Sequence, residues 1–174
     1  MEKQNPMREI RIEKLTLNIG AGKDQDVLAK GMKLFTALTG KTPVKTVTNK
    51  RIPEWGVRPG LPIGCKITLR KKDAAEMIKR LLDAKSFTLE KGCFDNYGNI
   101  SFGVHEYIDI KGAKYDPDIG IIGLQACITL ERPGFRIKRR RLKSKISKKH
   151  IITQQEAIDF MKKNFNVKLG GEEQ

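Results

Sequence analysis

The chain has 174 residues, 39% of them hydrophobic, and carries 35 Lys and Arg against 20 Asp and Glu, a formal net charge of +15. This length and composition predict a single globular domain over residues 1–174 and exclude an intrinsically disordered chain. No apolar run reaches 18 residues, so we expect no membrane-spanning segment. The start, MEKQNPMREI, lacks the apolar stretch of a secretory signal. Cys65, Cys93 and Cys127 have no paired spacing, so we expect a reducing cytoplasm, no disulfides and no bound metal.

The first part of the chain shows strand and helix patterns in turn. Leu15, Leu17 and Ile19 alternate with polar residues, which predicts a strand with one buried face. A helix is expected to follow, capped by Asp24 and ended by Gly40. The predicted elements are a strand over residues 9–20, a helix over 24–39, a strand over 43–48, an irregular basic loop over 49–64 and a strand over 65–70.

The second part adds two more predicted helices. Asp73 with Glu76 predicts a capping box for a helix ending near residue 84, and Thr153 with Glu156 predicts one for the last helix. Strands are expected over residues 99–104, 106–110 and 124–130, a basic excursion over 132–149 and a frayed tail over 170–174. Together these elements predict an α+β fold: an antiparallel sheet with helices packed on one face and the other face open.

Three groups of residues suggest chemistry, but each is better explained structurally. The turn at Gly20–Lys23 lacks the first glycine and the Ser or Thr of a phosphate-binding loop, so it predicts a tight turn into a helix. His105 beside Glu106 has no partner at metal or catalytic spacing. Cys65 alternates with apolar residues and is expected in the core. We therefore predict no enzyme activity and no cofactor.

The positive charge is concentrated in two segments. Residues 49–72 hold seven basic residues and one acidic residue, and residues 132–149 hold ten basic residues and no acidic one. The rest of the chain sums to a charge of −1. A solvated surface would spread the charge, whereas a nucleic-acid footprint concentrates it.

Structured RNA fits this pattern better than DNA. No helix has the basic face of a major-groove reader. The outward strand positions are small, polar or basic, which suits contacts to 2′-hydroxyls and phosphates. Another structured-RNA-binding or DNA-binding basic protein is the alternative.

Five motifs of the chain are distinctive: KLTLNIGAG (14–22), LTGKTPVKTVTNKRI (38–52), GLPIGCKITLR (60–70), KYDPDIGIIGL (114–124) and LERPGFRIKRRR (130–141). In this order they resemble the 5S RNA-binding ribosomal protein family L-five of the large subunit, in its archaeal and eukaryotic branch. The chain departs from many members by having Lys41 in place of a Gln and Gln125 in place of an acidic residue.

The resemblance implies a structural constituent of the large ribosomal subunit in the cytoplasm, acting as a monomer within the ribosome. It implies binding to 5S rRNA in the central protuberance and to large-subunit rRNA, contact with peptidyl-site tRNA, and a bridge to a protein of the small-subunit head. The expected 5S rRNA-binding residues are Thr16, Asn18, Lys41, Thr46, Lys66, Thr68 and Arg70. The expected tRNA-contacting residues are Asn49, Lys50, Arg51, Trp55 and Arg58, on a mobile loop. Other expected RNA contacts are Arg136, Lys138, Arg139, Arg140 and Arg141. For Trp55 we favour packing against the body over stacking on a base, because lone aromatic residues are usually packed.

Overall fold

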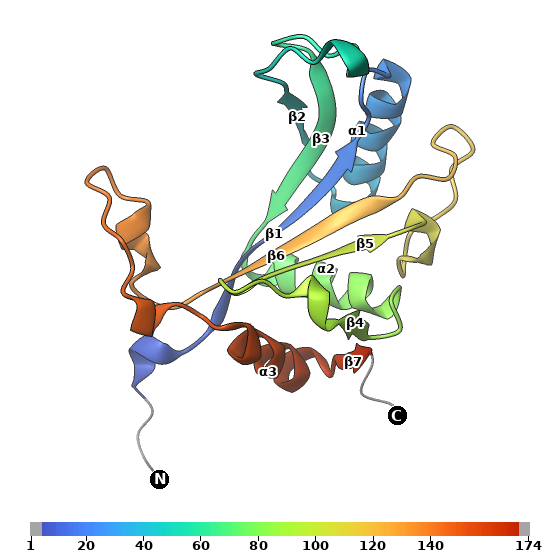
Figure 1. The fold of residues 1–174 in the computed structure, drawn as a ribbon. Coiled ribbons are helices and arrows are strands. Elements are labelled where there is room, and N and C mark those ends of the chain that lie inside the picture. The colour runs from blue at the N-terminus through green and yellow to red at the C-terminus, as the bar shows by residue number, and fades with distance from the viewer. Residues whose placement is uncertain (1–4, 171–174) are drawn as a thin grey trace. The chain divides into compact units, whose positions relative to one another are not determined.

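The structure is a computed structural model that describes residues 5–170. Over these residues it contains three α-helices, a five-stranded antiparallel sheet and a two-stranded sheet (Figure 1). The helices are α1 (Gln25–Thr39), α2 (Lys71–Asp83) and α3 (Gln154–Phe165). The larger sheet has the order β2 (Val44–Val47), β3 (Pro62–Leu69), β1 (Arg11–Gly20), β6 (Leu124–Glu131) and β5 (Asn99–Val104). The smaller sheet pairs β4 (Thr88–Glu90) with β7 (Lys168–Gly170) in parallel. The predicted α+β class is confirmed.

The contacts divide the chain into two compact units. Unit 1 comprises residues 5–15, 70–102 and 127–170, and unit 2 comprises residues 16–69 and 103–126. Each unit therefore combines segments that are far apart in the sequence. The prediction of a single domain stays a prediction.

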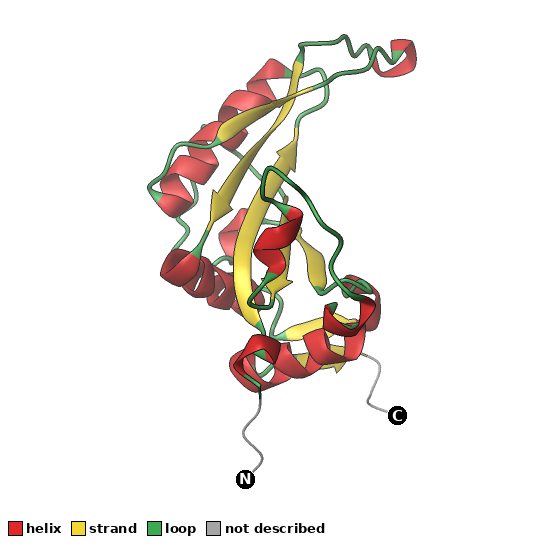
Figure 2. Cartoon of the chain, turned by 90° about the vertical axis from the view of Figure 1, so that its left-hand side faces the viewer, coloured by secondary structure: helices red, strands yellow, loops and turns green. Residues whose placement is uncertain are grey.

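In unit 2, helix α1 packs against strand β3 (Figures 1 and 2). Gly31 of α1 lies at the contact: a Cβ there would come within 3.0 Å of the Cys65 Sγ. The glycine thus allows the helix to approach the strand closely. The apolar side of α1 is buried, which stabilises the fold by about 1.5–3 kcal/mol for each large side chain. It consists of Leu28, Leu34, Phe35 and Leu38, with Gly40 ending the helix at φ +66°.

In unit 1, helices α2 and α3 each bury one apolar face. The capping box of α3 is confirmed: the Glu156 N–H donates to the Thr153 hydroxyl, and the Thr153 N–H donates to the Glu156 carboxylate. The buried residues of α3 are Ala157, Ile158, Met161 and Phe165. The predicted frayed tail falls mostly outside the described residues, apart from Gly170, which ends β7.

Three local predictions were wrong. Residues 106–110 are not a strand but contain a 3-10 turn, Tyr107–Asp109, because the buried residues Tyr107 and Ile110 are three apart rather than two. The capping box at Asp73 is wrong, since α2 begins two residues earlier, with Arg70 at its N-cap position and no side-chain cap. Asp24 stands at the N-cap of α1 without a side-chain hydrogen bond to the helix. In addition, the pairing of β4 with β7 was not predicted at all.

Candidate nucleic-acid interface

Strands β1 and β3 of unit 2 present an open polar surface. Burial alternates along both strands: Cys65, Ile67 and Leu69 are buried, whereas Lys66 and Thr68 between them are exposed. Thr16 and Asn18 are half-buried on β1, and the Asn18 amide donates to the Gln125 Oε1 at 3.5 Å. Solvent therefore reaches the hydroxyls and amides that the sequence assigns to RNA contacts.

Two further predicted contact residues lie at the β2 side of unit 2. Lys41 is exposed, and Thr46 is half-buried and pairs with Gly64 of β3. A Cβ at Gly64 would lie 2.5 Å from the Ile19 carbonyl oxygen and 3.1 Å from the Thr46 Oγ1. Only glycine lets the backbones of β1 and β3 approach this closely while Thr46 keeps its position.

The basic loop between β2 and β3 carries internal pairing that the sequence did not predict. At its base, the Thr48 N–H donates to the Leu61 carbonyl at 3.0 Å, and the Gly60 N–H donates to the Thr48 carbonyl at 2.8 Å. Farther out, Ile52 and Val57 exchange backbone hydrogen bonds of 2.9 and 3.1 Å. The loop is thus a short paired arm ending in a 3-10 turn. Its predicted tRNA-contacting residues Asn49, Lys50, Arg51, Trp55 and Arg58 are all exposed.

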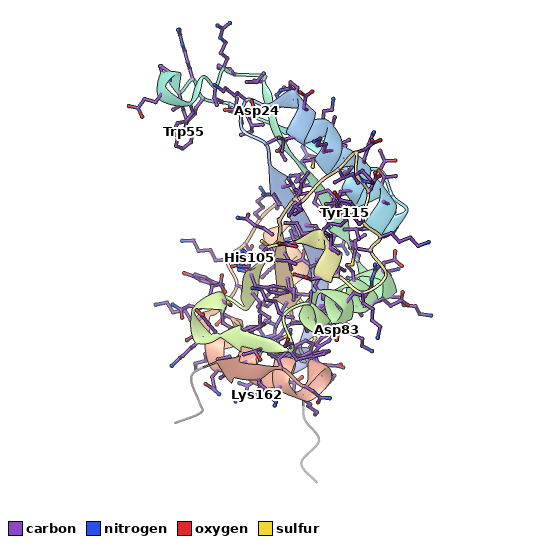
Figure 3. All side chains as sticks on the ribbon, turned by 90° about the vertical axis from the view of Figure 1, so that its right-hand side faces the viewer. Asp24, Trp55, Asp83, His105, Tyr115 and Lys162 are labelled. Atoms are coloured by element: carbon purple, nitrogen blue, oxygen red, sulfur yellow. The ribbon has the colours of Figure 1, made fainter. Side chains whose placement is uncertain are left out.

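Trp55 does not anchor the loop. Its side chain is 67% exposed and lies at the outer end of the arm (Figure 3). The buried apolar side chain of the arm is that of Val57, which is 5% exposed. The interpretation of Trp55 as a packed residue is therefore wrong, and an exposed aromatic ring is free to stack on a base.

The excursion of unit 1 is fixed at its base by Arg132, which is 4% exposed. Its guanidinium donates to the Glu156 Oε1 at 2.6 Å and to the His150 and Ile151 carbonyl oxygens at 3.3 and 3.4 Å. Burial raises the pKa of Glu156, but the hydrogen bond from the Thr153 backbone and the Arg132 guanidinium outweigh that effect and lower this pKa overall. Arg132 thus joins the start of the excursion to the segment that directly follows the excursion and to the first turn of α3.

The outer part of the excursion contains the predicted RNA contacts. Within it, the Ser144 N–H donates to the Ile137 carbonyl at 3.1 Å, and the Arg140 Nε donates to the Leu142 carbonyl at 2.7 Å. Lys138 lies 5.1 Å from the centre of the buried Phe135 ring. All five predicted residues are exposed: Arg136, Lys138, Arg139, Arg140 and Arg141.

A cluster of five charged residues joins this excursion to the strands of unit 1, and the sequence analysis missed it. Glu13 lies on β1 and Glu131 at the end of β6, and their side chains are 7% and 9% exposed. Arg139 of the excursion pairs with both carboxylates, Arg11 pairs with Glu131 at 2.8 Å, and Arg70 lies 3.9 Å from Glu13. We call these residues the glutamate–arginine cluster. The sequence did contain a signal for it: in an alternating strand, Glu13 falls on the same face as Leu15, Leu17 and Ile19.

The structure shows the surroundings of the three groups that suggest chemistry, over residues 5–170. The N–H groups of Ala21 and Gly22 both donate to the Ile63 carbonyl, so they are not directed at a phosphate. Burial raises the pKa of the Cys65 thiol, which disfavours a reactive thiolate. His105 and Glu106 are exposed. Over residues 5–170, no three His, Cys, Asp or Glu side chains are grouped so as to hold a metal ion, and no helix is long and apolar enough to cross a membrane.

An α+β fold with exposed basic segments and an open polar strand face is typical of a non-catalytic nucleic-acid-binding protein. Comparison with known proteins defines the family. A profile described as ribosomal protein L5 matches residues 5–58, and a second profile, described as the C-terminus of the same ribosomal family, matches residues 62–160. The chain therefore belongs to the ribosomal protein L5 family, as its motifs predict.

The similar curated proteins cover nearly the whole chain. The large ribosomal subunit protein uL5 of Sulfolobus acidocaldarius is 49% identical over 97% of this chain and 95% of its own length. The protein of the same name from Nanoarchaeum equitans is 46% identical over 95% of this chain and 99% of its own length. The protein is accordingly a non-enzymatic structural constituent of the large subunit of the cytoplasmic ribosome, of the type found in archaea.

Proposed function

We propose that the protein binds 5S rRNA in the central protuberance of the large subunit and also contacts large-subunit rRNA. The observation that carries this proposal is the exposure of the polar strand residues of unit 2, including Lys66 and Thr68. Lysine and arginine neutralise phosphates and release counterions, which supplies affinity, while hydroxyls and amides fix the position of the RNA. The proposed contact residues are Thr16, Asn18, Lys41, Thr46, Lys66, Thr68 and Arg70, with Arg136 and Lys138 to Arg141 as further contacts.

The paired arm of unit 2 is proposed to reach the peptidyl-site tRNA. Its exposed residues combine three cations, Lys50, Arg51 and Arg58, with the ring of Trp55. Cations beside an exposed aromatic ring suit a nucleic-acid backbone with an accessible base. In this proposal the protein is present as a monomer in the ribosome and also helps form the bridge to a protein of the small-subunit head.

A binding titration with competitors tests the 5S rRNA proposal. We expect the protein to bind 5S rRNA, with log affinity falling by several units per unit of log salt, at about 0.7–0.9 per phosphate contact. Duplex DNA should compete poorly. A flat salt response would contradict the proposal, and equal competition by DNA would favour a general DNA-binding or RNA-binding protein.

A further inference from the structure

The most basic part of unit 1 contains two nearly buried acids. The side chains of Glu13 and Glu131 are 7% and 9% exposed. An ionised carboxylate at this depth is costly unless cations and hydrogen-bond donors surround it. A chain with a net charge of +15 could place such residues far from its binding surface, so their position inside the basic region needs a physical explanation.

Arg139 connects the two carboxylates. One terminal nitrogen of its guanidinium pairs with Glu13, and the other donates to the Glu131 Oε2 at 2.9 Å. A planar guanidinium held at both ends has one fixed orientation. Arg139 follows the 3-10 turn Phe135–Lys138, so this double contact also fixes the excursion against the strands of its own unit.

Each of the other two arginines of the cluster lies beside one of these acids. Arg11 donates through both its Nε and a terminal nitrogen to the Glu131 Oε1, at 2.9 and 2.8 Å, and Arg70 lies 3.9 Å from the Glu13 Oε1. The side chains of Arg11, Arg70 and Arg139 remain 61%, 55% and 44% exposed. Three guanidiniums with five N–H donors each therefore share two carboxylates, leaving a net positive charge and donors that face solvent.

We infer that the glutamate–arginine cluster is a preformed phosphate-binding site for the RNA backbone, in which Glu13 and Glu131 are the positioning residues. The inference rests on the proposed RNA-binding function. The acids hold the arginines in place before RNA arrives, so less side-chain freedom is lost on binding. By positioning the arginines, Glu13 and Glu131 strengthen the binding of a polyanion although they are themselves negatively charged.

Two substitutions separate positioning from net charge. The double variant Glu13→Gln/Glu131→Gln removes two negative charges, so charge alone would tighten RNA binding. Arg139→Lys keeps the charge, but a compact ammonium cannot reproduce the planar double contact to both carboxylates. The matched control is Glu90→Gln/Asp83→Asn, which removes two exposed acids of the same unit.

The dissociation constant for 5S rRNA at fixed salt is the first measurement. We expect both the double glutamate variant and Arg139→Lys to bind about fivefold more weakly than the unmodified protein, the net size of one ordinary hydrogen bond. The control should bind equally or more tightly. Binding by Glu13→Gln/Glu131→Gln that is as tight as that of the control would overturn the inference. If this variant fails to fold, the trypsin digestion of Arg139→Lys described below decides, because Arg139 is also a proposed RNA contact; this variant should fold, since its side chain is 44% exposed and both acids keep a cation.

Trypsin digestion without RNA is the second measurement, and it separates this inference from the proposed function. Cleavage within residues 136–149 should be faster in both variants than in the control, because the excursion has lost its attachment to the strands. Unchanged cleavage would overturn the positioning role. Faster cleavage in the variants, together with an unmodified protein that does not bind 5S rRNA, would refute the proposed function and leave the positioning role intact.

Discussion

At the scale of single residues, the pair of Arg132 and Glu156 connects the fold to the basic excursion. Arg132 is buried, whereas the Glu156 side chain is 42% exposed, so solvent weakens their attraction. Glu156→Gln keeps a side chain suited to the capping box but leaves a buried guanidinium without its counter-charge. We expect it to lower the free energy of unfolding by about 1–2 kcal/mol at pH 7, measured by urea denaturation.

The pH dependence of this difference follows from the lowered pKa of Glu156. A carboxylate with a depressed folded-state pKa stabilises the fold above its unfolded value of about 4.3, and this stabilisation is lost as the pH falls through the folded value. The difference in the free energy of unfolding between the unmodified protein and Glu156→Gln should therefore become smaller below about pH 4. Exposed Glu90→Gln should change the free energy of unfolding by less than about 0.5 kcal/mol. A gap that stays constant to low pH would contradict the ion pair.

At the scale of elements, the strand face and the arm are expected to have separate tasks. Thr68→Ala/Arg70→Ala removes side chains from the proposed 5S rRNA surface and should weaken 5S rRNA binding about tenfold. Deleting residues 51–58 leaves intact the backbone hydrogen bond between Thr48 and Leu61, where the arm joins the strands. The deletion should therefore spare 5S rRNA binding and disturb tRNA placement on assembled ribosomes. Equal losses of 5S rRNA affinity in the two variants would refute this division.

Periodicity predicted the elements whose residues are contiguous and whose burial is regular. Strand β1 from Leu15 to Ile19 and helix α1 are examples, because their buried residues recur at the spacing of a strand and of a helix. The same reasoning failed at Tyr107, where a single buried turn has no period to detect. The parallel pair of β4 and β7 joins two three-residue strands that lie far apart along the chain. No local pattern specifies such a contact.

The candidate site shows the same limit. The positions of Lys66 and Thr68 follow from strand alternation, so their exposure was predictable. The glutamate–arginine cluster joins residues up to 126 positions apart, namely Glu13 and Arg139. The burial of Arg132 could not be predicted either, because a basic residue within a run of basic residues is expected to be exposed to solvent.

At the scale of the whole molecule, the surplus charge lies in two segments that we assign to RNA, and the remaining chain is a nearly neutral body. The first segment divides between the units, with residues 49–69 in unit 2 and residues 70–72 in unit 1, and the excursion lies in unit 1. Since a folded RNA offers many phosphates, both segments can contribute to one binding event.

Co-purification is the most direct test of this assignment. The tagged protein should be isolated from its own cells at moderate salt, after the large ribosomal subunits have been disassembled so that the long large-subunit rRNA is removed, and its bound RNA sequenced. We predict that 5S rRNA is the main RNA recovered, and that it is lost as the salt concentration is raised. Recovery of the protein with no RNA, or with a mixture in which 5S rRNA is not enriched, would contradict the central claim.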